Sequence, residues 1–463
     1  MPDAAHHNRT DGAGLKSLAS FAAQIDCKTL PPGITVRARA CLLYGLAVGI
    51  AALRARAPQI AAAALDFEYG DAAGKSTRFI DRKRVSAGAA AFANGVLMHA
   101  RVQDDAHPAG HVGVVVIPAA LAVAEQLGAS GEDLLAALVA GYEVALRIGR
   151  DHAADLSSRG FRTTPPSGAF GAAAAAARLM RLDGERTMHA LALAANTAGG
   201  LREFSNAGSG EYPFHAGFTA RNGISAASCA QSRAEAAATS LEGAAGFYRA
   251  FGEQGKDYGR RLSERLGEEF ALPGITYKPY PVCQFHRSVI RGVLELRKRA
   301  PDNELRAMVI RMNPFEADFF GVRYAGPYKT FSQAFMSAQF CAALAWSAGD
   351  VTYQGLHEFE DANVLREIPR IEVVSDPARQ RYQPHIAVHC ADGAARLWEE
   401  TAGEDAFSLT WDAAVQMSGI LCGEVGVPQA AAADLIRAAN LVAEAPDVTD
   451  VIGAVCAAIN GIQ

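Results

Sequence analysis

The sequence lacks the features that mark several large functional classes. Its 463 residues include 44 Lys and Arg against 49 Asp and Glu, which gives a formal net charge of −5 and a pI of about 6.2. Nucleic-acid-binding proteins and membrane-surface proteins need a basic excess to attract phosphate groups, so neither class is expected. Lysine is also scarce, since only eight of the 44 basic residues are lysine, and each lysine is therefore informative.

Long apolar runs and paired cysteines are missing as well. Stretches such as VGVVVIPAALAVA reach about 13 residues, short of the ~18 needed to cross a bilayer, and the N-terminal stretch MPDAAHHNRTDGAG has no apolar signal core. The eight cysteines include no CxxC pair, which argues against a zinc ribbon or a disulfide framework. Buried thiols in a reducing compartment fit better. We therefore expect a soluble cytoplasmic protein with no membrane and no nucleic-acid partner.

What the sequence does contain is helical periodicity. Half of the residues are hydrophobic, and between about residue 15 and residue 255 they recur at spacings of three and four, as in ARACLLYGLAVGIAALRARA and EDLLAALVAGYEVALRIG. Ser130 precedes acidic residues at the start of one such segment and is predicted to cap it. We also expect one helix to end near His99 and the next to begin near Pro118.

The pattern changes near residue 271, where prolines and a glycine in ALPGITYKPYP interrupt the helices. The strand-like segments AMVIRM, RIEVVSD and HIAVHCADG follow, interleaved with helical stretches. Helical periodicity returns after residue 404. The sequence therefore predicts a mainly α protein, with a large all-helical domain formed by residues 1–270 and 401–463 and a smaller α+β lid domain inserted at residues 271–400.

The stretch DDAHPAGH places Asp104, Asp105, His107 and His111 within eight residues. Two histidines four apart on a helix suit a metal ion, but Pro108 and a glycine lie between them, and no further ligand pair of convincing spacing appears. We therefore predict no metal site. Two interpretations remain open from these residues alone: the carboxylates cap helices beside solvated histidines, or the loop carries out acid/base chemistry.

Three other polar stretches interrupt the apolar pattern. LSSRGFRTTPPSGAFG sets arginine and threonine before a helix, where an anion binds well. GLREFSNAGSGEYPFHAGF holds Tyr212 and His215, and ITYKPYPVCQFHRS holds Lys278 at the predicted domain boundary. Taken singly, each has an ordinary interpretation as a helix cap, a core histidine or an exposed lysine. Four such loops in one apolar chain favour a shared cleft.

The chain resembles the MmgE/PrpD family, which includes 2-methylcitrate dehydratase, cis-aconitate decarboxylase and iminodisuccinate epimerase. The stretches that carry the resemblance are NGVLMHA, DDAHPAGH, IPAALAVAEQLGASGEDLLAALVAGYEVALRIG, RGFRTTPPSGAFGAAAAAARLMRLD, HAGFTARNGISAASCAQSRAEAAATSLEGAAGFYRAF and YKPYPVCQFHRS. The resemblance as a whole covers roughly residues 15–400 and fades after residue 350. No single stretch is specific to the family, but the combination is.

The resemblance implies a fold and a chemistry. The fold is a large helical domain formed by both chain ends with a smaller α/β lid, in a homodimer whose site lies between the domains. Catalysis is expected to need no metal and no organic cofactor, on small di- or tricarboxylic acids. The shared chemistry is removal of a proton, or of CO2, next to a carboxylate, followed by loss of water or reprotonation.

The resemblance also assigns residues to roles. His111 matches the family histidine after the acidic loop and is the expected general acid/base, with an ordinary pKa of about 6.5. Lys278 matches the lysine of the family's K-x-Y/F-P stretch and is expected to bind a carboxylate or to stabilise an enolate. Asp104 and Asp105 match the two consecutive acids of the family's DFDD loop and are expected to orient His111. Tyr324, in VRYAGPYKT, falls near a tyrosine of the family's lid.

The chain departs from the family pattern at three positions. Val102 stands in the DFDD loop in place of an additional aspartate, Arg162 replaces a second histidine in GFH, and Tyr212 replaces the lysine of K-P-x-H. An arginine restores a cation but cannot act as a base, whereas a tyrosine retains a proton donor with a pKa of about 10. Tyr212 therefore joins the predicted catalytic set, and the predicted substrate-binding set is His107, Arg162, Thr163, His215 and Tyr324.

From this site we expect a lyase of dehydratase type that abstracts a proton next to a carboxylate of a small hydroxy-di- or tricarboxylic acid. If His111 and Tyr212 lie on opposite faces of the substrate, the alternative is an isomerase or epimerase that works through the same carbanion-like intermediate. The departures leave a third alternative, a non-catalytic binder on a degenerate family scaffold.

Overall fold

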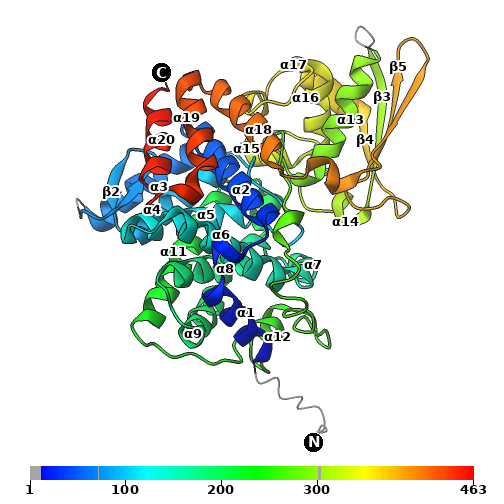
Figure 1. The fold of residues 1–463 in the computed structure, drawn as a ribbon. Helices are drawn as coiled ribbons and strands as arrows, with labels where there is room; N and C mark the ends of the chain where they lie inside the picture. Colours follow the sequence, from blue (N-terminus) through cyan, green and yellow to red (C-terminus); the bar gives the residue numbers. More distant parts are fainter. Residues whose placement is uncertain (1–11, 71, 301–303, 463) are drawn as a thin grey trace, which may run out of the picture.

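Helices make up most of the structure. The computed structural model describes residues 12–70, 72–300 and 304–462, and this part of the chain contains 20 α-helices and two small sheets (Figure 1). The predicted mainly α class is confirmed.

The larger part is a helical body to which both ends of the chain contribute. The last helices, α18 (Trp411–Glu424), α19 (Gln429–Asn440) and α20 (Thr449–Asn460), pack against α2 near the N-terminus (Figure 1), so one hydrophobic core contains residues from both ends. The other helices of this body are α1 (Ala13–Gln24), α2 (Pro32–Ala51), α3 (Arg56–Tyr69), α4 (Ala87–His99), α5 (Gly113–Leu127), α6 (Gly131–Arg150), α7 (Ala153–Ser158), α8 (Thr164–Leu179), α9 (Gly184–Ala195), α10 (Glu203–Ala207), α11 (Tyr212–Gln231) and α12 (Phe247–Phe251).

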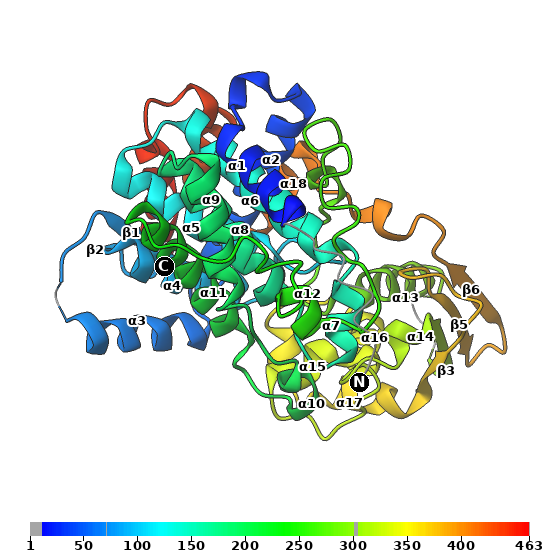
Figure 2. The same cartoon turned by 90° about the horizontal axis from the view of Figure 1, so that it is seen from below.

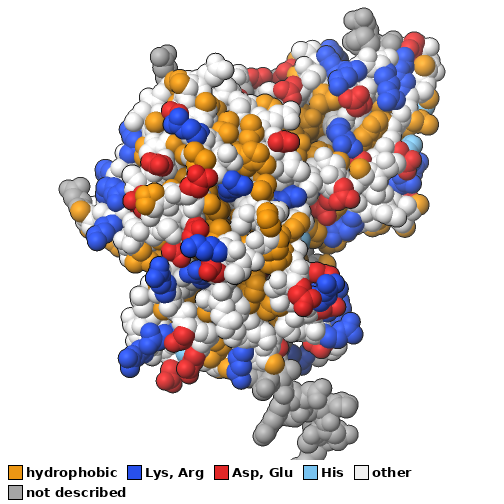
Figure 3. Space-filling view, in the orientation of Figure 1, with side chains coloured by type: hydrophobic (Ala, Val, Ile, Leu, Met, Phe, Trp, Pro, Cys, Tyr) orange, Lys and Arg blue, Asp and Glu red, His pale blue; other side chains and the backbone are white. Residues whose placement is uncertain are grey.

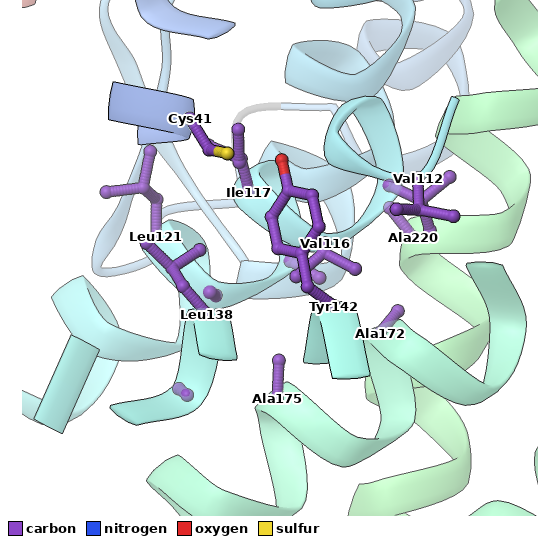
Figure 4. Close-up of a cluster of buried hydrophobic side chains, with 14 of the residues drawn as sticks. Cys41, Val112, Val116, Ile117, Leu121, Leu138, Tyr142, Ala172, Ala175 and Ala220 are labelled. Atoms are coloured by element: carbon purple, nitrogen blue, oxygen red, sulfur yellow. The ribbon is translucent and has the colours of Figure 1, made fainter. Parts of the chain in front are cut away.

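Small side chains let the central helices of this body pack closely. α8 presents fully buried alanines throughout residues 172–177 to its neighbours α5, α6, α9 and α11. Figure 4 shows Ala172 and Ala175 beside the larger side chains of Val116 and Tyr142, whose hydroxyl is turned away from the alanines. Interiors packed to this density tolerate little change in side-chain volume, so the body is a rigid support for the loops at its edge.

The smaller part has a separate core built on a four-stranded sheet. The strand order is β4-β3-β5-β6, with β3 parallel to β4 and antiparallel to β5, and β5 antiparallel to β6. Helices α13 and α16 pack against this sheet and against each other. The elements are β3 (Leu305–Met312), β4 (Ile371–Ser375), β5 (His385–Cys390), β6 (Ala395–Glu399), α13 (Arg287–Lys298), α14 (Pro314–Ala317), α15 (Phe331–Met336), α16 (Ala338–Ala348) and α17 (Ala362–Glu367).

Backbone pairing ties the two parts together at the DDAHPAGH loop. The Ala106 N–H donates to the Thr276 carbonyl at 2.8 Å, and the Thr276 N–H donates back to Ala106 at 2.9 Å. Thr276 also pairs with Ser408. The loop between α4 and α5 is therefore held against the segments where the chain enters the second core and returns from it.

Of the two helix starts predicted from the sequence, the structure confirms one. Ser130 caps α6 as predicted, because its hydroxyl accepts the Asp133 N–H at 3.2 Å. α5, however, begins at Gly113 rather than near Pro118, and the proline lies inside the helix. A proline there costs a backbone hydrogen bond, but residues 113–124 of α5 are all buried, so packing outweighs that cost.

Two small strands interrupt the first half of the chain, where only helices were expected. β1 (Ser76–Arg78) and β2 (Lys83–Val85) form a hairpin of their own. Residues 1–11 of the polar N-terminal stretch, from which no signal segment was predicted, lie outside the described residues.

One described helix, α2, is long and apolar enough to cross a membrane. Most of it is buried, however, because α4, α5, α6, α18, α19 and α20 pack around it, as expected for the core helix of a globular protein. On the face shown in Figure 3, acidic and basic side chains are interspersed over both parts of the molecule.

Candidate active site

A cavity of about 150 Å³ lies between the two cores and is lined by residues of both. At this junction α10 of the helical body contacts α15 of the smaller part (Figure 2). Within the described part of the chain no Asp or Glu contributes to the lining, so the cavity favours a small anion. Its cationic residues are Arg150, Arg162, Arg202, Lys278 and Arg381, and its aromatic residues are Phe161, Phe204, Tyr212, Phe285, Phe315, Phe319 and Phe335.

Asp104 is the centre of a polar network behind this cavity, and it is only 1% exposed. Its Oδ1 lies 3.0 Å from His99 Nδ1 and 3.4 Å from Lys278 Nζ, and its Oδ2 lies 3.0 Å from His111 Nδ1. Burial raises the pKa of Asp104, but the Lys278 ammonium and the two histidines outweigh burial, and the pKa lies well below its usual value. Asp104 is therefore a carboxylate at neutral pH.

His111 presents one ring nitrogen to the cavity. Its Nδ1 donates to the backbone carbonyl of Asp105 at 2.7 Å, and its backbone N–H donates to Thr164 Oγ1 at 2.9 Å. Among the described residues, none bonds to Nε2. Burial and the Lys278 ammonium lower the pKa of His111, against the opposing effect of Asp104. At neutral pH the ring is therefore neutral with its lone pair on Nε2, which is the form a general base requires.

Arg162 joins the same network through His99. Its Nη2 donates to His99 Nε2, and its Nη1 donates to the Tyr212 carbonyl at 2.8 Å. Because a guanidinium only donates, Nε2 of His99 must accept, and its Nδ1–H then donates to Asp104. Burial lowers the pKa of His99 to about 3, so the ring stays neutral. Burial also lowers the pKa of Arg162 to about 10, which still leaves it charged at neutral pH.

Two glycines allow the loop to reach this geometry. Gly110 has a φ of +129°, and a Cβ there would lie 2.9 Å from backbone atoms of Thr164. Gly113 begins α5, and a Cβ there would lie 2.3 Å from the Tyr142 hydroxyl and 2.4 Å from Asp105 Oδ2. A side chain at either position would displace the loop that carries His111.

Asp105 points away from its neighbour Asp104. Its carboxyl group accepts from the Tyr142 hydroxyl at 2.6 Å and from the Gly113 N–H at 3.2 Å, and it does not line the cavity. Burial raises its pKa to about 7. The side chain thus anchors the start of α5, and the part of Asp105 that contacts His111 is its backbone carbonyl.

Tyr212 lines the cavity, but its hydroxyl is engaged elsewhere. The hydroxyl donates to the Ala100 carbonyl at 2.9 Å, and the ring stands edge-on to His99 with the centroids 5.3 Å apart. Burial raises the pKa of Tyr212 well above its usual value. A phenol held in this way is poorly placed to exchange a proton with a substrate, so the geometry gives no support to a second proton carrier.

The residues predicted to bind substrate divide into two groups. Arg162 and Thr163 line the cavity, whereas the other three do not. His107 accepts the backbone N–H two residues further on at 3.0 Å, and Tyr324 donates to the backbone carbonyl three residues further on. His215 stands edge-on to a phenylalanine of the lining. These three side chains therefore pack locally instead of facing the cavity.

Several residues of the site were not predicted. His99 ends α4 directly before the acidic loop, and that position was the available signal. Arg202 and Arg381 also line the cavity. Arg202 stands in the polar stretch GLREFSNAGSGEYPFHAGF without having been singled out there, and Arg381 stands in no quoted stretch. Val102, in place of an acid of the family, lines the cavity with a φ of +58°, a region that β-branched residues rarely adopt. Across the described residues, no group of three or more His, Cys, Asp and Glu side chains is arranged to hold a metal ion.

Comparison with known proteins places the chain in a family. The MmgE/PrpD N-terminal domain matches residues 16–258, more than half of the chain, and the chain therefore belongs to the MmgE/PrpD family, which confirms the resemblance found in the sequence.

Three curated relatives are similar over shorter segments. The cis-aconitate decarboxylase-like protein oryM of Aspergillus oryzae is 33% identical over 224 residues, 46% of this chain and 46% of the relative. The cis-aconitate decarboxylase of Homo sapiens is 39% identical over 145 residues, 30% of each chain. That of Mus musculus is 38% identical over 146 residues, 30% of this chain and 29% of the relative. The chain thus spans less than half the length of each of these relatives.

Proposed function

We propose that the protein is a cofactor-independent lyase of dehydratase type that acts on a small hydroxy-di- or tricarboxylic acid. The observation that carries this proposal is a neutral His111 with Nε2 unengaged, next to the Lys278 and Arg162 cations in a cavity of about 150 Å³. The names of the relatives, two of which are cis-aconitate decarboxylases, support a carboxylic acid as the substrate class.

In the proposed reaction, Arg162 and Lys278 bind carboxylates of the substrate. Nε2 of His111 takes a proton from the carbon next to one carboxylate, and the Lys278 ammonium stabilises the negative charge that develops there. Asp104, 3.0 Å from Nδ1, stabilises the imidazolium. The bond to the hydroxyl on the neighbouring carbon then breaks, and the hydroxyl leaves as water with the proton that His111 returns.

Two other reactions have weaker support. Decarboxylation, which the names of the relatives favour, requires His111 to deliver a proton to the carbanion, and the lowered pKa of His111 disfavours its protonated form. An isomerase requires a second proton carrier on the opposite face, and the Tyr212 hydroxyl already donates to Ala100. Dehydration, by contrast, begins with proton abstraction by His111. That step requires the neutral His111 ring, which is the form that burial and the neighbouring charges favour.

Proton NMR in D2O tests the proposal, with citrate, methylcitrate, aconitate, malate, tartrate and iminodisuccinate as probes. We expect deuterium to enter next to a carboxylate, and vinyl signals to grow from a hydroxy acid. His111→Ala should lower the rate by about 10²–10⁴-fold, whereas His389→Ala, which removes an exposed histidine of β5, should leave it unchanged. Exchange or epimer growth without vinyl signals would select the isomerase. No exchange with any probe would contradict proton abstraction and leave the non-catalytic binder.

We also propose that the protein forms a homodimer, as the resemblance implies. The support is an apolar surface on two contacting helices: Ile60, Phe67 and Tyr69 of α3 and Phe218 of α11 are exposed, and Phe67 is 94% exposed. Exposed apolar patches of this kind mark protein interfaces. Light scattering should give twice the chain mass for the wild type and a monomer for Phe67→Asp. A monomeric wild type would contradict the proposal.

A further inference from the structure

The proposed chemistry does not use three of the arginines that line the cavity. Arg150 pairs with Asp151 at 3.4 Å, which leaves Arg202 and Arg381. Arg202 precedes α10 in the helical body, and Arg381 lies between β4 and β5 of the smaller part, and both line the cavity. The position of both arginines needs an explanation, because removing a guanidinium from bulk water costs free energy unless an anion or several acceptors bind its N–H groups.

Both guanidinium groups stack on one cluster of phenylalanines. The Arg202 guanidinium carbon lies 4.3 Å from the ring centroid of Phe319, and that of Arg381 lies 4.3 Å from the ring centroid of Phe315. The two rings are 6.3 Å apart, and Phe285 contacts both. A cation–π contact of this kind uses none of the N–H donors of the guanidinium, which stay available for an anion.

Neither guanidinium forms a close ion pair in the described part of the chain, although burial raises the pKa of Glu316 and of Glu404 and the Arg381 cation acts from a longer distance to lower it. Arg202 donates to Ser157 Oγ at 2.7 Å, and Arg381 donates to the Tyr382 hydroxyl at 3.0 Å, but no carboxylate oxygen of a described residue lies within 4.0 Å of either. The Nε–H of each arginine is buried without a hydrogen-bond partner among the described residues. Unsatisfied buried donors that line a cavity indicate a missing acceptor.

This group is distinct from the one around His111. Arg162 lies over Phe204 and Tyr212, with centroid distances of 5.3 and 5.9 Å, and Tyr212 contacts Phe335. Among the described residues, no ring contact joins these aromatic residues to the phenylalanines beneath Arg202 and Arg381. The cavity is therefore lined by two groups of cations, each on its own aromatic cluster, and Phe335 and Met336 add apolar lining.

We infer that Arg202 and Arg381 form a second anion subsite, which binds a carboxylate at the end of the substrate remote from the carbon that His111 deprotonates. The substrate class is then a diacid whose two carboxylates are separated by an apolar spacer, rather than a compact acid held only at the His111 end. This inference rests on the proposed function only for the statement that His111 deprotonates the substrate. Because the two arginines belong to different cores, a bound distal carboxylate also links the two parts of the molecule.

Calorimetric titration of the His111→Ala variant tests the subsite without turnover. The probes are 2-hydroxy diacids of four to eight carbon atoms and the 2-hydroxy monoacids of the same lengths. We expect one of the longer diacids to bind at least about tenfold more tightly than its monoacid, since a charge-assisted hydrogen-bonded contact is worth about that factor or more. Arg202→Gln and Arg381→Gln should each lower diacid affinity by about 10- to 100-fold and leave monoacid affinity unchanged.

Unchanged monoacid binding shows that each variant is folded, and Arg379→Gln is the matched control. Arg379 is two residues from Arg381, but it pairs with Glu399 and does not line the cavity, so its replacement should change neither affinity. Equal binding of diacid and monoacid, equal weakening of both in the arginine variants, or no binding of any probe would overturn the inference. A diacid preference in His111→Ala together with no deuterium exchange by the native protein would refute the proposed function and leave the subsite standing.

Discussion

Replacing Asp104 by asparagine and Lys278 by methionine, singly and together, tests the charge pair on which the proposed site depends. Both side chains are at most 2% exposed, and Nζ lies 3.4 Å from Oδ1. At this distance two unit charges attract by about 5 kcal/mol for an effective dielectric constant of about 20. Salt screens a buried pair much less than an exposed one, so the double-mutant cycle should retain most of that energy.

The expected changes in the free energy of unfolding follow from burial. Each single replacement leaves the other charge buried without its partner and should cost about 3 kcal/mol. The double variant removes both charges, and methionine fills most of the lysine volume, so it should be only about 2 kcal/mol less stable than the wild type. The coupling free energy is then about 4 kcal/mol, slightly below the Coulomb value.

Urea unfolding at pH 7, followed by circular dichroism, gives the free energy of unfolding of the wild type, the two single variants and the double variant. Asp434→Asn is the control, because it removes an exposed carboxylate that pairs with Arg437 and should cost less than about 1 kcal/mol. A coupling below about 1 kcal/mol would refute the reasoning, since the pair would then be screened like a surface ion pair or Lys278 would be uncharged.

The same cycle has a predicted pH dependence. The pKa of Asp104 is lowered in the folded protein, so its contribution to stability is fully present above the unfolded pKa of about 3.9 and is lost as the pH falls through the folded pKa. The coupling at pH 5 should therefore equal the coupling at pH 7.

Three further replacements test the surroundings of the loop. Tyr212→Phe removes the donor to Ala100 and should cost about 1 kcal/mol in urea unfolding with unchanged turnover; a loss of turnover of about 100-fold would instead make Tyr212 a proton carrier. Gly110→Ala places a Cβ 2.9 Å from Thr164 at a φ of +129° and should cost about 1–3 kcal/mol and lower kcat, so an unaltered thermal midpoint would contradict the strained geometry. Burial raises the pKa of Asp105 to about 7 in the folded protein. The stability of the wild type relative to Asp105→Asn should therefore fall as the pH rises from about 4 to about 7. A stability difference that does not change with pH would show that the pKa is not raised.

Motif reasoning singled out the residues that we propose to react, because they stand in short stretches with a recognisable pattern. Asp104, His111 and Lys278 were all predicted, and the structure places both His111 and Lys278 within 3.4 Å of the Asp104 carboxylate. The same reasoning could not tell which of Asp104 and Asp105 directs its carboxylate toward His111. Their side chains leave an irregular loop in different directions, and the decisive partner of Asp105, Tyr142, lies 37 residues away.

Arg202 and Arg381 were not predicted in this way, although Arg202 stands in the polar stretch GLREFSNAGSGEYPFHAGF. Arg202 and Arg381 are far apart in the sequence, and each follows or precedes a short element whose position depends on how the two cores pack. Their shared environment is created by Phe315 and Phe319, which a pattern of apolar residues assigns to a core as readily as to a cavity wall. His99 was hidden for a similar reason, since a histidine on an apolar helix is usually a core residue.

Two of the departures from the family pattern, Arg162 and Tyr212, form one compatible arrangement. A replacement that did not fit its surroundings would leave its own buried polar groups unpaired, at a cost of about 1–3 kcal/mol each. Here Arg162 donates to His99 and to the Tyr212 carbonyl, and the Tyr212 hydroxyl donates to Ala100. A lysine at position 212 would bring a second buried cation toward Arg162. With tyrosine at position 212, Arg162 is the one cation beside His99 among the described residues. Its guanidinium donates to Nε2 of His99 and so fixes the tautomer in which Nδ1–H of His99 donates to Asp104. The replacements therefore preserve the charge around Asp104 and His111, which argues for an altered substrate rather than for a lost reaction.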